Sequence, residues 1–579
     1  MDTLSPLSRA STLDRVFGFI ESLPSSDRLL LKAALGVFFG GLIWLGFSLN
    51  ALFLNDIPHA GGTLREGIVG TPRFINPILA VTTADQDLSA LVYAGLMKLG
   101  TDGTLTPAIA ESVTISDDGL VYNVVLRKDV TFHDGDPLTT DDVVFTIERL
   151  QDPALKSPLR ASWEGVSMEQ IGEHEMNFVL PEAYAPFIEN LTLGILPKHI
   201  WANATTEELP FSQYNSEPIG AGPYEVTDIK RNSSGIPASY ELTAYNDYFA
   251  GTPKIETLLL SFYPTEDALI GAFTRKEIES AGGLSPSALT RLADSGAPVS
   301  YISTPLPRTF TVFFNQNETP AFRDSTVRKA LEKAVDRDAI VAQVLDGHGV
   351  AITTPIPPGF STFTEAAATS SSVALDEART ILREGGWRFN DASGLWEKTT
   401  DDGTLTLQFS ISTSNTPVFQ QTAELLKERW GRLGVPVTVK QFEQSDLTQT
   451  VIRPRKYDAL LFGTVVGREL DFFSFWHSSQ RNDPGLNVAL YANITTDALL
   501  SEARQTGSRE KRAEIYQKFA EEIDEETPAI FLYVPTYTYA RASKVQNVSL
   551  SGIARGSERL SSIDQWYIEK DSVWPFFTD

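Results

Sequence analysis

The sequence predicts an α/β fold with several lobes, preceded by one transmembrane helix. The chain has 579 residues, of which 42% are hydrophobic and 21% are charged. That length and composition allow more than one buried core and are not typical of a disordered chain. Short strands and helices are mixed without a strict strand–helix–strand repeat, which favours a multi-lobed α/β architecture. One uncharged apolar run lies near the N-terminus and predicts the membrane helix.

The apolar run covers residues 33–54 and reads AALGVFFGGLIWLGFSLNALFL. At about 1.5 Å per residue, a helix of this length crosses the roughly 30 Å core of a bilayer. Basic residues up to Lys32 precede the run, and Asp56 is the first charge after it. The positive-inside rule therefore places residues 1–28 in the cytosol and the main domain outside the cell or in the periplasm. We expect a retained anchor over residues 29–54, and a cleaved signal peptide is the alternative.

Charge and cysteine content exclude several classes of function. The formal net charge is -26, which argues against nucleic acid as a partner because phosphates would be repelled. The acidity chiefly supports solubility. The chain has no cysteine, so disulfides, thiol nucleophiles, cysteine-ligated metals and a lipid-modified cysteine are all excluded.

The segment at residues 117–150 reads DDGLVYNVVLRKDVTFHDGDPLTTDDVVFTIERL and carries a dense local pattern. An Asp-Gly turn precedes residues 120–126, whose alternation predicts a strand, and a second short strand is expected over residues 130–132. Thr139 or Thr140 can cap a helix whose apolar residues recur every three or four positions. The pattern therefore predicts a strand–strand–helix unit.

Later segments predict further elements in the same way. Gly220 and Gly222 permit a close chain approach or positive φ, and proline then fixes the exit. Apolar spacing predicts one helix over residues 324–345. Other expected elements are a helix over 374–387 ended by Gly385 and Gly386, a helix over 419–433, strands over 435–439 and 457–461, and a helix followed by a strand within 512–532.

Residues 117–150 resemble the signature of family 5 extracellular solute-binding proteins, the oligopeptide, dipeptide and nickel receptors of bacterial ABC importers. Other segments resemble the family's motifs in the family's order, so the likeness covers nearly everything after residue 60. These segments are 73–77, 90–96, 104–112, 218–224, 324–345, 374–387, 457–461 and 512–532.

This resemblance implies a two-lobed fold like that of periplasmic binding proteins, of the class II "Venus flytrap" type, with an additional inserted domain. Two strands would cross between the lobes. By this analogy the chain comprises the cytosolic segment 1–28, the anchor 29–54, lobe I at 60–93, 208–305 and 532–579, the inserted domain II at 94–207, and lobe III at 306–531.

No motif for catalysis or for a metal or cofactor stands out. The six histidines are scattered without metal-ligand spacing, and no nucleophile elbow, phosphate-binding loop or dinucleotide fingerprint occurs. We interpret His133, which lies in the signature turn, as a structural residue. The sequence therefore predicts a binding protein and no enzyme, with no cofactor.

The resemblance also implies where a ligand would bind. Val81 and Thr83 align with a lobe I strand whose backbone bonds to the peptide main chain in oligopeptide receptors. The family's peptide receptors hold the α-ammonium of the ligand with an aspartate, and its expected position here falls near Gly467. One hypothesis is that Asp471 takes this role.

Two aromatic residues follow Asp471 and belong to the same hypothesis. Phe473 and Trp476 would line the ligand pocket beside this carboxylate. Two alternatives stay open: the ligand has no free amine at this place, or these aromatic residues only pack lobe III. A carboxylate paired with an ammonium in a desolvated cleft would contribute more than a surface pair.

The predicted function is that of a membrane-anchored substrate-binding component of an ABC importer, which binds oligopeptides and delivers them to a permease driven by ATPase subunits. Another solute, such as a nickel chelate or an oligosaccharide, is the first alternative. A peptide sensor or chaperone outside the cell is the second. An extracellular hydrolase is the third, and it lacks a nucleophile or metal motif.

Overall fold

The computed structural model divides into two compact units, which are described separately. The first unit comprises Met1–His59 with Glu569–Asp579, and the second comprises Ala60–Ile568. The structure describes residues 18–20, 22–360, 374–401 and 403–574. Most of the predicted cytosolic segment lies outside these ranges.

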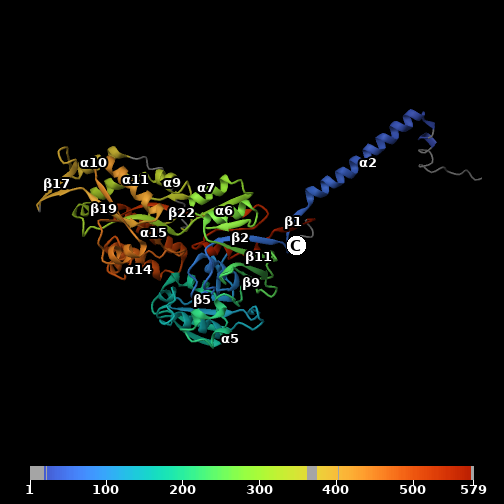
Figure 1. The fold of residues 1–579 in the computed structure, drawn as a ribbon, viewed down its shortest axis with the longest axis horizontal. Coiled ribbons are helices and arrows are strands. Elements are labelled where there is room, and N and C mark those ends of the chain that lie inside the picture. Colours follow the sequence, from blue (N-terminus) through green and yellow to red (C-terminus); the bar gives the residue numbers. More distant parts are fainter. Residues whose placement is uncertain (1–17, 21, 361–373, 402, 575–579) are drawn as a thin grey trace, which may run out of the picture. The chain divides into compact units, whose positions relative to one another are not determined.

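The first unit contains the predicted N-terminal helix and a two-stranded sheet (Figure 1). Helix α2 (Ser25–Phe53) has a mean hydropathy of 1.9 over its apolar part, none of which is buried. Strand β1 (Asn55–His59) pairs antiparallel with β23 (Glu569–Val573), so the segment that follows the helix forms a small sheet with a strand near the C-terminus. The helix is long and apolar enough to cross a membrane.

The second unit is built on one mixed sheet of twelve strands. Its order is β20-β19-β21-β14-β22-β12-β2-β11-β10-β9, and β13 and β15 also pair with β22. The strands are β2 (Thr63–Val69), β9 (Tyr224–Arg231), β10 (Pro237–Ala244), β11 (Thr257–Tyr263), β12 (Ser280–Gly282), β13 (Val299–Pro305), β14 (Arg308–Phe314), β15 (Gly349–Ala351), β19 (Phe409–Ser414), β20 (Val437–Phe442), β21 (Ala459–Val465) and β22 (Ala529–Ala542).

Strand β22 belongs to two halves of this sheet. Its amino-terminal part pairs with β14 and β15, and its carboxyl-terminal part pairs with β12 and β13. We call the part with β2 and β9–β13 the first half and the part with β14, β15 and β19–β21 the second half. The chain passes between them in β22 near Pro535 and in the link from Pro305 to Arg308, and these two passages are called the crossing. The two-lobed α/β fold predicted from the sequence is confirmed.

Helices cover both faces of the sheet. In the second half, α8 to α11 enclose one core and α13 to α15 another, on opposite sides of the strands (Figure 1). The helices are α3 (Thr83–Val92), α4 (Thr140–Gln151), α5 (Lys198–Trp201), α6 (Glu266–Thr274), α7 (Pro286–Asp294), α8 (Ser325–Lys333), α9 (Arg337–Val344), α10 (Leu375–Glu384), α11 (Pro417–Leu433), α12 (Gln444–Asp446), α13 (Phe473–Trp476), α14 (Ile494–Gln505) and α15 (Arg509–Glu526).

Smaller sheets lie outside the main one. The segment predicted as an insert contains an antiparallel sheet of order β5-β6-β8-β7 packed against α4. Its boundaries, and those of the two lobes, stay predictions. The small strands are β3 (Met97–Leu99), β4 (Leu105–Pro107), β5 (Ala110–Ile115), β6 (Val121–Leu126), β7 (Ser167–Gly172), β8 (Glu175–Val179), β16 (Arg388–Asn390), β17 (Leu395–Thr400) and β18 (Gly403–Thr406).

The signature segment folds largely as predicted. Strand β6 and helix α4 are present, and Thr139 caps α4 in a capping box with Asp142. The expected second strand over residues 130–132 is wrong, because only a single bridge joins Thr131 to Pro137. The chain instead turns tightly at Gly135, which has φ +89 and places Phe132 N within hydrogen-bonding distance of Asp136 O.

One long helix was expected over residues 324–345, and this prediction is wrong. The segment forms α8 and α9, separated after Lys333. Asp336 accepts a hydrogen bond from Ala339 N and therefore caps the second helix. The helices α10, α11 and α15 and the strands β20 and β21 confirm the other expected elements within a few residues. Strand β22 begins where a strand was expected but continues to Ala542, ten residues beyond the expected end at residue 532.

Gly220 and Gly222 are required by close packing and not by positive φ. A Cβ atom on Gly220 would lie 2.1 Å from Val92 O, and one on Gly222 would lie 2.5 Å from Leu91 O. The imidazole of His133 packs against the same loop: its Nε2 donates to Gly222 O at 3.1 Å, and its Nδ1 accepts from Gly220 N at 3.4 Å. This pattern needs a neutral ring, which agrees with the predicted structural role of His133.

We expect the stability of the protein to fall in mild acid because of His133. Burial of the ring lowers its pKa from 6.5 to about 4. Between these values the unfolded chain binds a proton that the folded chain excludes, so stability is lost as pH falls from 6.5 to about 4, by at most about 3 kcal/mol. Urea unfolding of the full chain in detergent at several pH values measures this loss.

The variant His133→Gln provides the comparison because glutamine does not titrate. It should be less stable than the native chain at pH 7.5, yet lose less stability on acidification. An equal loss in both proteins over this range would show that His133 does not carry the effect.

Candidate functional site

The carboxyl ends of the parallel strands in both halves point toward the crossing. Strand β14 leaves the crossing at Arg308, and β21 runs antiparallel to it, so β21 arrives there at Val465; β19 and β20 run parallel to β21. In the first half, β12 runs antiparallel to β22 and arrives at Gly282, with β2 and β11 parallel to it. Ligands of open α/β sheets bind outside the carboxyl ends of the strands, so the crossing is the candidate site.

The loop that follows β21 contacts two other parts of the chain. Glu469 N donates to the carboxylate of Glu189, and Arg468 donates to Gly552 O at 2.9 Å and pairs with Glu558. The side chain of Arg468 is only 2% exposed, so this pair lies in a desolvated place. We call these contacts, together with the pairs described next, the junction network.

Asp471 lies in the junction network, where its carboxylate is already paired. Its two oxygens accept from Arg504 Nε at 2.9 Å and Nη2 at 2.5 Å, and Tyr184 donates to it at 3.3 Å. Arg504 lies 4.0 Å from the ring centroid of Phe473 and 5.3 Å from that of Tyr184. The carboxylate therefore has a protein cation where the hypothesis placed a ligand ammonium.

Neighbouring acids of the network are paired as well, or are shifted toward the neutral form. Glu469 pairs with Arg512, and both side chains are nearly buried. Burial raises the pKa of Glu189, although Arg468 opposes this. Burial also raises the pKa of Tyr184, which keeps its hydroxyl protonated and able to donate.

Trp476 and Phe473 have different surroundings. Trp476 is 3% exposed and packs among Phe313, Phe519 and Phe531 in the second half. The ring of Phe473 is partly buried and stacks on His477 at 4.0 Å. Trp476 therefore packs within the second half, while Phe473 supports the guanidinium of Arg504.

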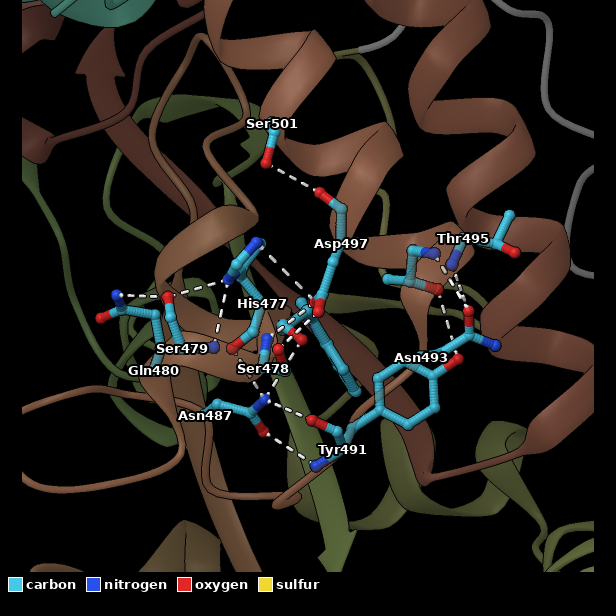
Figure 2. A network of polar contacts seen from close by, with 12 residues as sticks. His477, Ser478, Ser479, Gln480, Asn487, Tyr491, Asn493, Thr495, Asp497 and Ser501 are labelled. Carbon is cyan, nitrogen blue, oxygen red and sulfur yellow. Dashed lines mark hydrogen bonds and ion pairs between the residues drawn. The ribbon is translucent and has the colours of Figure 1, made fainter.

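A polar network fixes the chain after Trp476 (Figure 2). Asn487 is buried and donates from Nδ2 to the carbonyls of Trp476, His477 and Tyr491. Asp497 accepts from Ser478 N at 2.8 Å and from the Ser478 hydroxyl. These bonds hold the aromatic segment against α14, which carries Arg504, so the network positions the partner of Asp471.

Val81 and Thr83 do not lie on a strand, and that part of the expectation is wrong. Val81 is in a loop and is 63% exposed, while Thr83 is the first residue of α3. Thr82 and Asp85 form a capping box, and Asp85 also accepts from Arg73 N and Phe74 N. These bonds start a helix where the resemblance implied an extended segment. Ligand binding by Val81, Thr83, Asp471, Phe473 and Trp476 stays a prediction.

Sequence analysis missed Arg308, which opens β14 at the crossing. The only signal was a charged residue at the start of the otherwise largely apolar strand RTFTVFF. Its Nε is buried and has no hydrogen-bond partner within the part of the chain that the structure describes. Among the described residues no group of three His, Asp or Glu side chains could hold a metal ion.

One cavity, of about 750 Å³, lies in the second half between α9, α11 and the start of β20. Its lining includes Gln421, Leu425 and Val437. Since β20 runs toward the crossing, this cavity lies at the opposite end of the strand and is not part of the candidate site.

Comparison with known proteins agrees with this fold. The model of "Bacterial extracellular solute-binding proteins, family 5 Middle" matches residues 104–484. The chain is 28% identical to the oligopeptide-binding protein AppA of Bacillus subtilis, over 89% of this chain and 93% of that protein.

Two solved structures are similar over nearly the same span. The structure of AppA from Bacillus subtilis in complex with a nonapeptide is 27% identical, with a TM-score of 0.65, and the match covers 89% of this chain and 100% of that one. The structure of NikZ from Campylobacter jejuni in complex with Ni(L-His) is 25% identical, with a TM-score of 0.66, covering 87% and 99%.

We expect Asp471 to contribute to stability in the absence of ligand. Asp471→Asn leaves the largely buried Arg504 without its anion and should lower the free energy of unfolding by roughly 2–3 kcal/mol. Arg504→Gln should cost a similar amount. A double-mutant cycle measured by urea unfolding should give a coupling energy of roughly 1–3 kcal/mol.

The exposed pair Lys427–Glu424 is the matched control, with both side chains about half exposed. Glu424→Gln should change stability by less than about 0.5 kcal/mol. If Asp471→Asn behaved like this control, the ion pair would not be structural, and the ligand hypothesis for Asp471 would gain support.

Proposed function

The chain belongs to the family 5 bacterial extracellular solute-binding proteins, and on that premise we propose that it is the membrane-anchored, extracellular or periplasmic substrate-binding component of an ABC importer for peptides. The observation that carries the proposal is the similarity to an oligopeptide-binding protein, which covers 89% of this chain and 93% of that protein. The geometry supports it, because the strand ends of both halves point toward one crossing.

Binding would work by closure about the crossing. A ligand held at the strand ends of one half gains contacts with the other half only when the two come together, so it favours the closed form. The junction network shows that the loop after β21 can contact other parts of the unit, since it meets Glu189 and Glu558. Hydrogen bonds to the main chain of an extended peptide would not select particular side chains, so peptides of different sequence could bind.

Helix α2 would hold the protein at the membrane with its N-terminus in the cytosol. Its exposed apolar surface and the basic residues before it support this orientation. Tethering raises the local concentration of the binding domain near the permease. The permease and, through it, the ATPase subunits are the proposed partners, and nucleotide is bound by those subunits.

A second candidate ligand is a metal chelate such as a nickel complex. The paired state of Asp471 favours it, because this carboxylate is not free for the amine of a peptide. The similarity to NikZ bound to Ni(L-His) supports the same alternative. A small-molecule chelate needs fewer protein donors than a bare ion, which fits the scattered histidines.

We expect the purified full chain to retain peptides from its host. Native mass spectrometry in detergent should show bound masses that, once released and fragmented, read as peptide ladders. Addition of a peptide mixture to ligand-free protein should raise its melting temperature, since a ligand that binds only the folded state stabilises it. Retention of a metal chelate or sugar alone, with no shift from any peptide, would overturn the peptide assignment.

We expect the mature protein to keep helix α2. The protein should sediment with membranes, resist extraction by alkaline carbonate, and yield N-terminal peptides from before residue 25 on mass spectrometry. A mature soluble form that begins after about residue 54 would instead identify α2 as a cleaved signal segment.

A further inference from the structure

Arg308 is a cation that has no partner among the described residues around the candidate site. Among the described residues its side chain makes no hydrogen bond and no ion pair, and its Nε is buried. Burial lowers the pKa of this guanidinium, and no acidic group opposes that shift. Largely buried charges in proteins are normally paired, because desolvation without compensation is costly.

The surface beside Arg308 is apolar and partly open. Side chains alternate along a strand, so Arg308 shares a face of β14 with Phe310. Phe310 stacks on Tyr533 at 4.7 Å and lies 5.2 Å from Phe419. Val465, which is paired with Arg308 in the ladder, is 56% exposed. A cation thus adjoins aromatic and aliphatic surface at the carboxyl end of β21.

We propose that Arg308 binds a carboxylate of the ligand, with Phe310 and Val465 contacting the adjoining side chain. This inference rests on the proposed peptide-binding function and names the group that the site recognises. The planar guanidinium offers two parallel N–H donors that match a carboxylate, and such charge-assisted bonds are strong in a desolvated place. The C-terminal carboxylate and an Asp or Glu side chain of the peptide share this chemistry.

A ligand role and a structural role for Arg308 make different demands. An arginine that stabilises the fold has protein acceptors, and its removal lowers stability. Arg308 has none among the described residues, so Arg308→Gln removes an uncompensated charge and should leave the ligand-free protein as stable as before or more stable. Ligand-free melting temperature therefore separates the two roles before any binding is measured.

The experiment compares the native full chain in detergent with Arg308→Gln and Arg308→Lys. The probes are peptides of one sequence without Asp or Glu, prepared with a free and with an amidated C-terminus, and a third, amidated peptide containing one Glu. Isothermal titration calorimetry measures Kd. The control is Arg453→Gln, since Arg453 is 63% exposed and lies 3.7 Å from Asp483.

We expect amidation to weaken binding to the native chain roughly ten- to a hundredfold. Arg308→Gln should weaken binding of the free peptide by a similar factor and remove the discrimination, while Arg308→Lys keeps part of it. If the amidated Glu peptide binds as tightly as the free peptide, the carboxylate comes from a side chain. Equal discrimination in the native chain and Arg308→Gln would overturn the inference.

Failure of the proposed function is distinguishable from failure of this inference. If the native chain binds none of the peptides, the peptide assignment fails, and N-acetylalanine becomes the probe. A melting-temperature shift by N-acetylalanine that is present in the native chain and in Arg453→Gln but absent in Arg308→Gln would uphold a carboxylate site. The same response in all three proteins, or in none, would overturn it.

Discussion

The backbone ladder of β22 is the constraint on which the rest of the second unit depends. This strand has 14 residues and supplies hydrogen bonds to four other strands, two in each half. Because β12 and β14 both run antiparallel to it and lie in different halves, one arrives at the crossing where the other departs. β2 and β11 run parallel to β12, and β19, β20 and β21 run antiparallel to β14. The convergence of the carboxyl ends is therefore a consequence of one strand's pairing.

A buried charge cluster ties the C-terminal segment to the first half. Arg559 pairs with Asp87 at 2.7 Å and with Glu66, and all three side chains are at most 2% exposed. Burial raises the pKa of Asp87, although Arg559 opposes this, and Tyr539 donates to Glu66 at 2.7 Å. Breaking such a cluster would leave an unpaired buried charge, so it holds η8 (Gly556–Leu560) in place. Glu558 lies on that segment, and the cluster therefore also positions the partner of Arg468.

Local patterns in the sequence predicted the helices and strands well, but they did not predict the contacts between residues that are distant in the chain. The alternation at residues 120–126 and the capping residues before α4 depend on neighbours in the chain and could be read directly. The break between α8 and α9 could not, because Asp336 fits a helix surface as well as a cap. The pairing of Asp471 with Arg504 joins residues 33 positions apart, and no spacing rule indicates it. Arg308 carried no signal beyond its charge, since only the folded chain shows that none of the described residues pairs with it.

The charged side chains of the junction network pair with one another, which limits the charged groups of a ligand that the second half can bind. Arg468, Arg504 and Arg512 are matched by Glu558, Asp471 and Glu469, and the fourth acid, Glu189, is shifted by burial toward its neutral form. The network is thus close to neutral without any ligand, and a ligand ammonium would have to displace Arg504 from a bidentate pair. Arg308 is different because no described residue matches its charge in the same conformation. Electrostatic recognition on this side of the crossing therefore favours an anionic group, and peptide sequence would matter less than the presence of a carboxylate.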